Sequence, residues 1–245
     1  MLAVLLFDKK QMIDKNKISI CMMVDKNMIL NKNLKTVKAF SYIGLFIIWG
    51  VLETGIVPFM EQWLSVPDTE FIKEVVFKII IWFIPAFLLC RHYDDFLSIQ
   101  SKSSFSVEVK WLRVLPILFL FTAFHIISAC VQHGKISIDS SFRITDILIA
   151  VSVGISEEMV FRGWLLNVCL HDKKWVSIIE NAVLFLLIHF PVWIRHDLLS
   201  VYIMSGAFLQ IIILSIIFSC AFIKSRNILV PVVLHAYWDL LCFIL

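Results

Sequence analysis

The sequence has 245 residues, is 60% hydrophobic and has a mean hydropathy of +0.89, whereas a soluble domain is about half apolar. Apolar stretches of about 20 residues recur along it, which excludes a soluble globular protein and predicts a polytopic α-helical membrane protein. A transmembrane barrel is excluded because alternating segments of about ten residues are not seen. The net charge of +3 is spread over loops and a tail, which indicates contact with a lipid bilayer and no nucleic acid partner.

Residues 1–38 contain eight lysines, and we expect them to form a lysine-rich cytosolic tail. Seven apolar spans follow, so the predicted fold class is all-α, a polytopic bundle of about seven transmembrane helices. In the second span the long side chains of Lys73 and Lys78 can reach the membrane interface, and for Lys78 an ion pair is the alternative. The predicted spans are 39–59, 71–90, 111–131, 144–170, 175–194, 198–223 and 228–245.

The distribution of positive charge predicts the orientation of these spans. With the tail in the cytosol, the cytosolic segments hold 16 of the 22 Lys and Arg residues, the other side holds four, and two lie within spans. Loops rich in Lys and Arg stay in the cytosol. We therefore expect a multi-pass protein of the cell membrane with a cytosolic N-terminus and an outside C-terminus.

Three short motifs place ionisable side chains inside predicted spans, where charge is costly and indicates function. They are Glu157-Glu158-Met-Val-Phe-Arg162, Phe-Leu-Leu-Ile-His189 and His235-Ala-Tyr-Trp-Asp239. Residues four apart share a helix face, so Arg162 can pair with Glu158 and leave Glu157 aimed elsewhere. A structural ion pair is the alternative interpretation, but it accounts poorly for six ionisable groups.

The three motifs together supply the groups of a hydrolase. If their helices converge on one cavity, Glu157 can act as a general base for water, and an apolar environment would suit that role. His189 can share or orient the water, and His235 can donate a hydrogen bond to a developing oxyanion. The pattern therefore predicts a water-activating site within the membrane.

In order and spacing, the motifs resemble those of the CPBP family of intramembrane proteases. This family includes the type II CAAX prenyl proteases, which are Rce1-like, and bacterial homologues linked to bacteriocin immunity. The resemblance covers residues 144–245 and implies a catalytic four-helix core there, with residues 39–143 as accessory helices. It implies that Glu157 activates water with His189, and that Glu158 and Arg162 support the site.

The resemblance also implies that His235 and Asp239 form the oxyanion region. Several family members have Asn at the position of Asp239, and an ionised aspartate cannot donate a hydrogen bond to an oxyanion. Asp239 could instead fix the tautomer of His235 or stay protonated.

Two classes of function remain open. The first is an endopeptidase that cleaves a membrane-associated protein or peptide, including a CAAX-type tail or a maturing peptide. The second is a non-catalytic scaffold or bacteriocin-immunity protein of the same fold, and the intact set Glu157, His189 and His235 favours the first. We expect no cofactor, since no His-Glu-x-x-His motif is present, although zinc bound by these glutamates and histidines is a chemical alternative.

Overall fold

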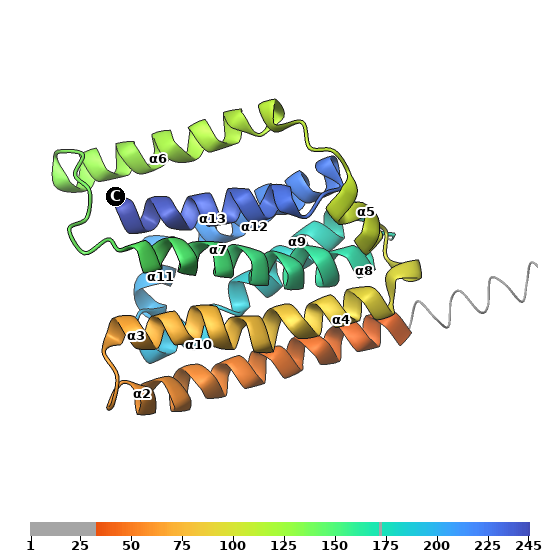
Figure 1. The fold of residues 1–245 in the computed structure, drawn as a ribbon, viewed down its shortest axis with the longest axis horizontal. Helices are drawn as coiled ribbons and strands as arrows, with labels where there is room; N and C mark the ends of the chain where they lie inside the picture. The colour runs from red at the N-terminus through yellow and green to blue at the C-terminus, as the bar shows by residue number, and fades with distance from the viewer. Residues whose placement is uncertain (1–32, 172) are drawn as a thin grey trace, which may run out of the picture. The chain divides into compact units, whose positions relative to one another are not determined.

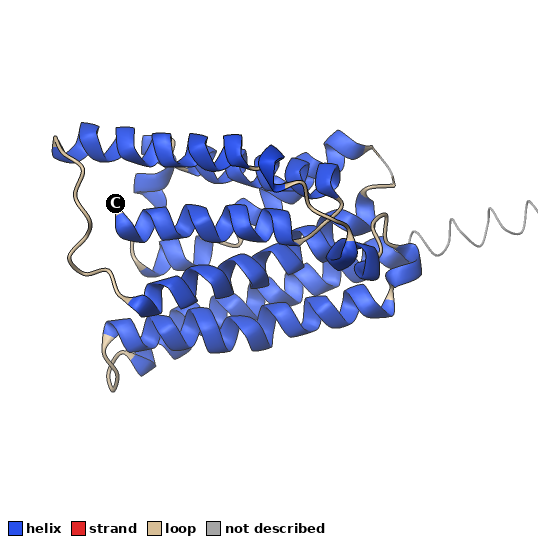
Figure 2. Cartoon of the chain, turned by 45° about the horizontal axis from the view of Figure 1, so that its top comes forward, coloured by secondary structure: helices blue, strands red, loops and turns tan. Residues whose placement is uncertain are grey.

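The computed structural model describes residues 33–171 and 173–245, which lie in two compact units, 1–41 and 42–245. Within the described residues the secondary structure is helical, with no strand (Figures 1 and 2). The predicted all-α class is therefore confirmed. The predicted tail falls mostly outside the described residues, but residues 33–38, which we assigned to it, are helical.

Long helices lie at the positions of the predicted spans. The first is Asn33–Met60, which ends in α2 (Val57–Met60), and the second joins α3 (Val66–Phe71) to α4 (Ile84–His92) through π-helical turns. The short α5 (Ser101–Ser106) precedes α6 (Leu115–His133). The remaining helices are α7 (Ile144–Glu158), π-helical Met159–Leu166, α8 (Asn167–Cys169), α9 (Lys174–Leu187), α10 (Phe190–Arg195), α11 (Leu199–Ser205), α12 (Phe208–Ser225) and α13 (Leu229–Ile244).

Two of the predicted spans are interrupted. The span 175–194 breaks at residues 188–189, where Pro191 at the start of α10 lacks the backbone N–H that a continuous helix would use. The span 198–223 is wrong as a single helix, because Gly206 has a φ of 74° and separates α11 from α12. Positive φ is a conformation that glycine adopts without steric cost.

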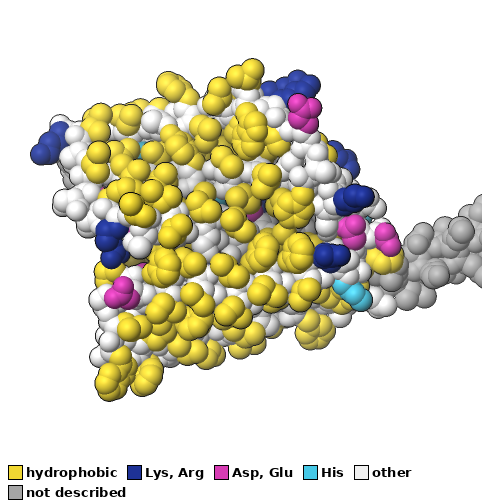
Figure 3. All heavy atoms as spheres, in the orientation of Figure 1, with side chains coloured by type: hydrophobic (Ala, Val, Ile, Leu, Met, Phe, Trp, Pro, Cys, Tyr) yellow, Lys and Arg dark blue, Asp and Glu magenta, His cyan; other side chains and the backbone are white. Residues whose placement is uncertain are grey.

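Apolar side chains cover the outside of the bundle, as Figure 3 shows for one face. Phe119, Val131 and Ile144 are 76%, 80% and 79% exposed, which would be unfavourable in water but suits contact with lipid. Among the described residues, four helices are long and apolar enough to cross a membrane. They are Asn33–Met60, Leu115–Gln132, Lys174–Arg195 and Phe208–Ser225. The molecule is therefore an all-α membrane bundle.

Close packing of α7 on α13 brings two of the motifs together (Figures 1 and 2). A Cβ atom on Gly154 of α7 would lie 3.0 Å from the carbonyl oxygen of Val232 and 3.1 Å from the backbone nitrogen of Ala236. Because these neighbours are backbone atoms, a side chain at this position would push the two helices apart, and glycine favours their close approach. Because Gly154 lies one turn before Glu157 and Glu158, the contact sets both glutamates beside His235.

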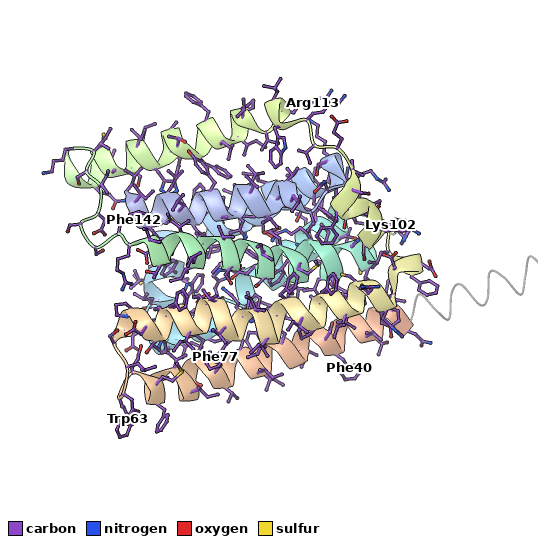
Figure 4. All side chains as sticks on the ribbon, viewed as in Figure 1. Phe40, Trp63, Phe77, Lys102, Arg113 and Phe142 are labelled. Carbon is purple, nitrogen blue, oxygen red and sulfur yellow. The ribbon has the colours of Figure 1, made fainter. Side chains whose placement is uncertain are left out.

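The helix ends in the unit 42–245 fall at two opposite ends. Figure 4 shows Trp63 and Phe142 at one end, and Lys102 and Arg113 at the other. We call these the Trp63 end, with loops 61–65 and 134–143, and the Arg113 end, with loops 93–114 and 226–228.

Candidate active site

A cavity of about 540 Å³ opens among the second helix, α7, the break between α9 and α10, and α13. Its inner part is lined by Lys78, Glu157, His189 and Asp239, together with the aromatic walls Trp49 and Trp82. Its outer part is lined by residues at the Trp63 end: Val66, Pro67, Glu70, Arg143, Asp146, His196 and Phe243. The volume is many times that of one water molecule, about 30 Å³, so water and a peptide segment could enter together.

Glu157 stands at the inner wall of the cavity and is 5% exposed. Its Oε1 accepts a hydrogen bond from Lys78 Nζ at 2.6 Å, and its Oε2 lies 3.8 Å from His235 Nε2. The expectation of an apolar environment for Glu157 is therefore wrong, because a buried ammonium binds one of its two oxygens. The other oxygen faces the imidazole.

Glu158 and Arg162 form the ion pair that their spacing predicts. Arg162 Nη1 donates to Glu158 Oε1 at 2.8 Å, and both side chains are fully buried. The second nitrogen of the guanidinium donates to the carbonyl oxygen and the hydroxyl of Ser215 on α12 at 3.0 and 2.9 Å. The ring of Phe185 lies 4.7 Å from the guanidinium carbon, so Arg162 links the α7 segment to both α9 and α12.

His235 is held by the second glutamate. Its Nδ1 lies 2.7 Å from Glu158 Oε1, and since an ionised carboxylate only accepts hydrogen bonds, Nδ1 carries the proton. Its Nε2 lies 3.6 Å from Asp239 Oδ2. The contact that fixes the His235 tautomer is therefore with Glu158, and not with Asp239 as we considered from the sequence.

His189 lies where α9 ends. Its Nδ1 donates to the carbonyl oxygen of Phe185, four residues earlier, at 2.7 Å, because a carbonyl oxygen can only accept. A neutral imidazole held in this way keeps Nε2 as a hydrogen-bond acceptor. His189 lines the same cavity as Glu157 and Asp239.

Aromatic rings pack around this cluster, among them the buried rings of Phe161 and Phe185. These two rings meet edge to face with centroids 4.8 Å apart, and Phe185 also contacts the rings of His189 and His235 at 5.2 and 5.9 Å. The ring of Phe218 stacks on His235 at 5.0 Å. The imidazoles are thus held by rigid packing as well as by hydrogen bonds.

Lys78 is the site residue that sequence reasoning missed. It is only 4% exposed, and Lys73 is 3% exposed, so the expectation that these side chains reach the membrane interface is wrong, and the alternative of a paired Lys78 is confirmed. Lys78 Nζ bonds Glu74 Oε2 at 2.6 Å as well as Glu157. The sequence signal that could have indicated a buried Lys78 is the spacing of four between Glu74 and Lys78 inside an apolar span.

A second charged cluster positions the segment after His189. Glu53 of the first helix is fully buried, and its two oxygens lie 3.4 Å from Lys73 Nζ and 3.2 Å from Arg195 Nε. Arg195 also pairs with Glu61 at 3.1 Å. Because Arg195 ends α10, these contacts tie α10 to the first two helices beside the outer part of the cavity.

A metal site is not formed by the donors that the structure describes. Within residues 33–171 and 173–245, no group of three or more His, Cys, Asp or Glu side chains has the arrangement that could hold a metal ion. Two of the carboxylates are instead bound by Lys78 and Arg162.

Fold and site together define a helical membrane protein whose cavity is lined by Glu157 of α7, His189 at the end of α9 and Asp239 of α13, with His235 of α13 beside Glu157. Residues 139–241 match the family model described as type II CAAX prenyl endopeptidase Rce1-like, and this segment carries all six candidate residues predicted from the sequence. In this segment the chain is therefore similar to the Rce1-like family of CAAX prenyl endopeptidases. Lys78 and Glu74 lie outside the matched segment. Comparison with curated proteins and with solved structures found no match.

Proposed function

We propose that the protein is an intramembrane glutamate-dependent endopeptidase that hydrolyses a peptide bond in a membrane-associated protein or peptide. The observation that carries the proposal is the geometry of Glu157. One of its oxygens is bound by Lys78, and the other faces His235 Nε2 at 3.8 Å in a cavity that His189 also lines. The family of residues 139–241 supports the same reaction class.

In this mechanism Glu157 Oε2 removes a proton from a water molecule that also donates a hydrogen bond to His189 Nε2. The resulting hydroxide adds to the carbonyl carbon of the scissile bond and forms a tetrahedral oxyanion. The oxyanion then restores its C=O bond as the C–N bond breaks, and the proton on Glu157 passes to the leaving nitrogen. General base catalysis of this kind contributes about 10²–10⁴-fold to the rate.

The oxyanion would be stabilised from α13. Since Nδ1 of His235 donates to Glu158, its Nε2 can donate to an oxyanion only when the ring carries both protons. Asp239 lies 3.6 Å from that nitrogen and Glu157 lies 3.8 Å away. These two carboxylates, with Glu158, would favour the doubly protonated ring. Glu158 and Arg162 then act by orienting His235.

The proposed orientation has a cytosolic N-terminus and an outside C-terminus. Within the unit 42–245, the Arg113 end carries eight Lys and Arg residues in its loops and at its helix termini, against three at the Trp63 end. The eight are Arg91, Lys102, Lys110, Arg113, Lys173, Lys174, Lys224 and Arg226, and the three are Lys135, Arg143 and Arg195. This bias supports a cytosolic Arg113 end. The outer part of the cavity would then face away from the cytosol, which favours an exported or membrane-inserted peptide over a cytosolic CAAX-type tail.

A peptide-cleavage assay tests the proposal directly. Purified protein in proteoliposomes is incubated with a library of apolar quenched peptides, alongside the Glu157→Ala and His189→Ala variants. We expect cleavage by the wild type alone, with new termini identified by mass spectrometry. Peptides that bind equally to all three proteins and remain uncleaved would place the chain in the non-catalytic class of scaffolds and bacteriocin-immunity proteins.

A further inference from the structure

Lys78 is a buried cation that the matched family segment does not include. It lies in the middle of the second helix, between its two π-helical stretches, and its ammonium nitrogen is 5.4 and 5.0 Å from the ring centroids of Trp49 and Trp82. Two carboxylates bind this nitrogen at the same distance, 2.6 Å: Glu74 on its own helix and Glu157 on α7. Among the residues that the structure describes, Lys78 is the one Lys or Arg side chain within 4 Å of Glu157, whose other oxygen lies 3.8 Å from His235 Nε2.

A purely structural role for Lys78 would need only one of these partners. A buried ammonium must be paired, and Glu74, one helical turn away, already meets that need. The contact with Glu157 is therefore an addition, made between side chains 79 positions apart in the sequence. It joins the second helix to Glu157, one of the carboxylates that line the cavity.

The contact also decides which oxygen of Glu157 is available. With Oε1 held by Lys78, rotation of the carboxylate is restrained, and Oε2 is the oxygen that faces His235 and the cavity. A nearby cation favours the ionised carboxylate, and a general base must be ionised before it can take a proton. Lys78 thus both restrains the rotation of the Glu157 carboxylate and favours its ionised form.

We propose that Lys78 is a positioning residue of the active site, which aims Oε2 of Glu157 at the attacking water and supplies the charge that keeps this carboxylate ionised. The proposal rests on the endopeptidase function. It assigns a catalytic purpose to the second helix, which the sequence predicted to be accessory. It also predicts that the segment 139–241 is not sufficient for full activity.

The test separates this role from simple charge balance. Lys78→Met alone leaves Glu157 without its lysine and leaves Glu74 with only Lys73, 3.2 Å away, so it could fail to fold. The double variant Lys78→Met with Glu74→Gln removes one charge of each sign and restores the balance, while Glu157 stays without its partner. The control is Glu74→Gln alone, which keeps the contact between Lys78 and Glu157.

We expect the double variant to fold, as judged by its size-exclusion profile and thermal unfolding, and to have kcat lowered about tenfold to a hundredfold with KM changed less than about threefold. A loss of this size is typical when a catalytic group is misplaced by about 1 Å. The control should stay within about threefold of the wild type in kcat.

Each outcome bears on the proposal. If the double variant folds and has the kcat of the wild type, the role of Lys78 is overturned. The endopeptidase function would still stand in that case, because the wild type turns over substrate. Equal losses in the double variant and in the Glu74→Gln control would also overturn it, because the loss would then follow Glu74. Absence of turnover in the wild type, with every peptide of the library, would overturn both.

Discussion

The buried pair of Glu158 and Arg162 gives a quantitative prediction about stability. Both side chains are fully buried, and the pair is closed by a hydrogen bond of 2.8 Å. In Arg162→Met, Glu158 keeps only His235 as a hydrogen-bond partner among the described residues, since its Oε2 has none. In Glu158→Gln, the guanidinium loses its carboxylate partner, and the polar groups left to it are neutral: the new amide oxygen and Ser215.

Each single substitution should lower the free energy of unfolding by about 3–5 kcal/mol, the usual cost of leaving one buried charge unpaired. For a chain of this size, that corresponds to a fall of about 6–20 °C in the melting temperature. The double variant should lose less than the sum of the single losses by about 1 kcal/mol or more. Thermal unfolding of the purified proteins in one detergent measures all four values.

A matched control is the pair of Arg143 and Asp146, which lie 3.7 Å apart with the arginine side chain 48% exposed. Arg143→Met should change the free energy of unfolding by less than about 1 kcal/mol, because exposed pairs contribute little. Strict additivity of the Glu158 and Arg162 variants, or losses no larger than that of the control, would refute the reasoning.

Three further predictions concern topology, metal and Asp239. A reporter fused after Lys38 should lie in the cytosol and one fused after Leu245 should lie outside. Finding both reporters on the same side would contradict the proposed orientation. Turnover should survive extensive chelation, whereas stoichiometric zinc whose removal abolishes activity and whose return restores it would convert Glu157 and the histidines into ligands. Asp239→Asn should keep kcat within about tenfold of the wild type, because Asn matches the family pattern and can still hydrogen-bond His235; a loss of a hundredfold would instead show that the charge of Asp239 is required.

The helices and the ion pair of Glu158 and Arg162 could be predicted from sequence because both depend on residues that are close together in the chain. Apolar stretches of about 20 residues mark spans, and a spacing of four places Arg162 beside Glu158. The break at residues 188–189 was readable in principle from Pro191. The convergence of the three motifs was only an assumption, and the structure supplies its cause in the close approach of α7 to α13 at Gly154.

The partner of Glu157 could not be predicted because it lies 79 positions away on a helix without a family motif. From hydropathy alone, a lysine near the end of a span is expected to extend its side chain to the membrane interface. Whether it turns inward depends on which carboxylates the neighbouring helix offers, here Glu157, and on the aromatic rings of Trp49 and Trp82 around it. These contacts exist only after the helices have packed.

The cleavage rate of the Glu157→Gln variant tests the central claim most directly. Glutamine keeps the shape of the side chain and can still accept a hydrogen bond from Lys78, but it cannot take a proton from water. With folding verified by size-exclusion profile and membrane insertion, we predict turnover of a native substrate lowered by about a hundredfold or more. Turnover at the wild-type rate in well-folded Glu157→Gln would contradict the account and move the protein to the non-catalytic class.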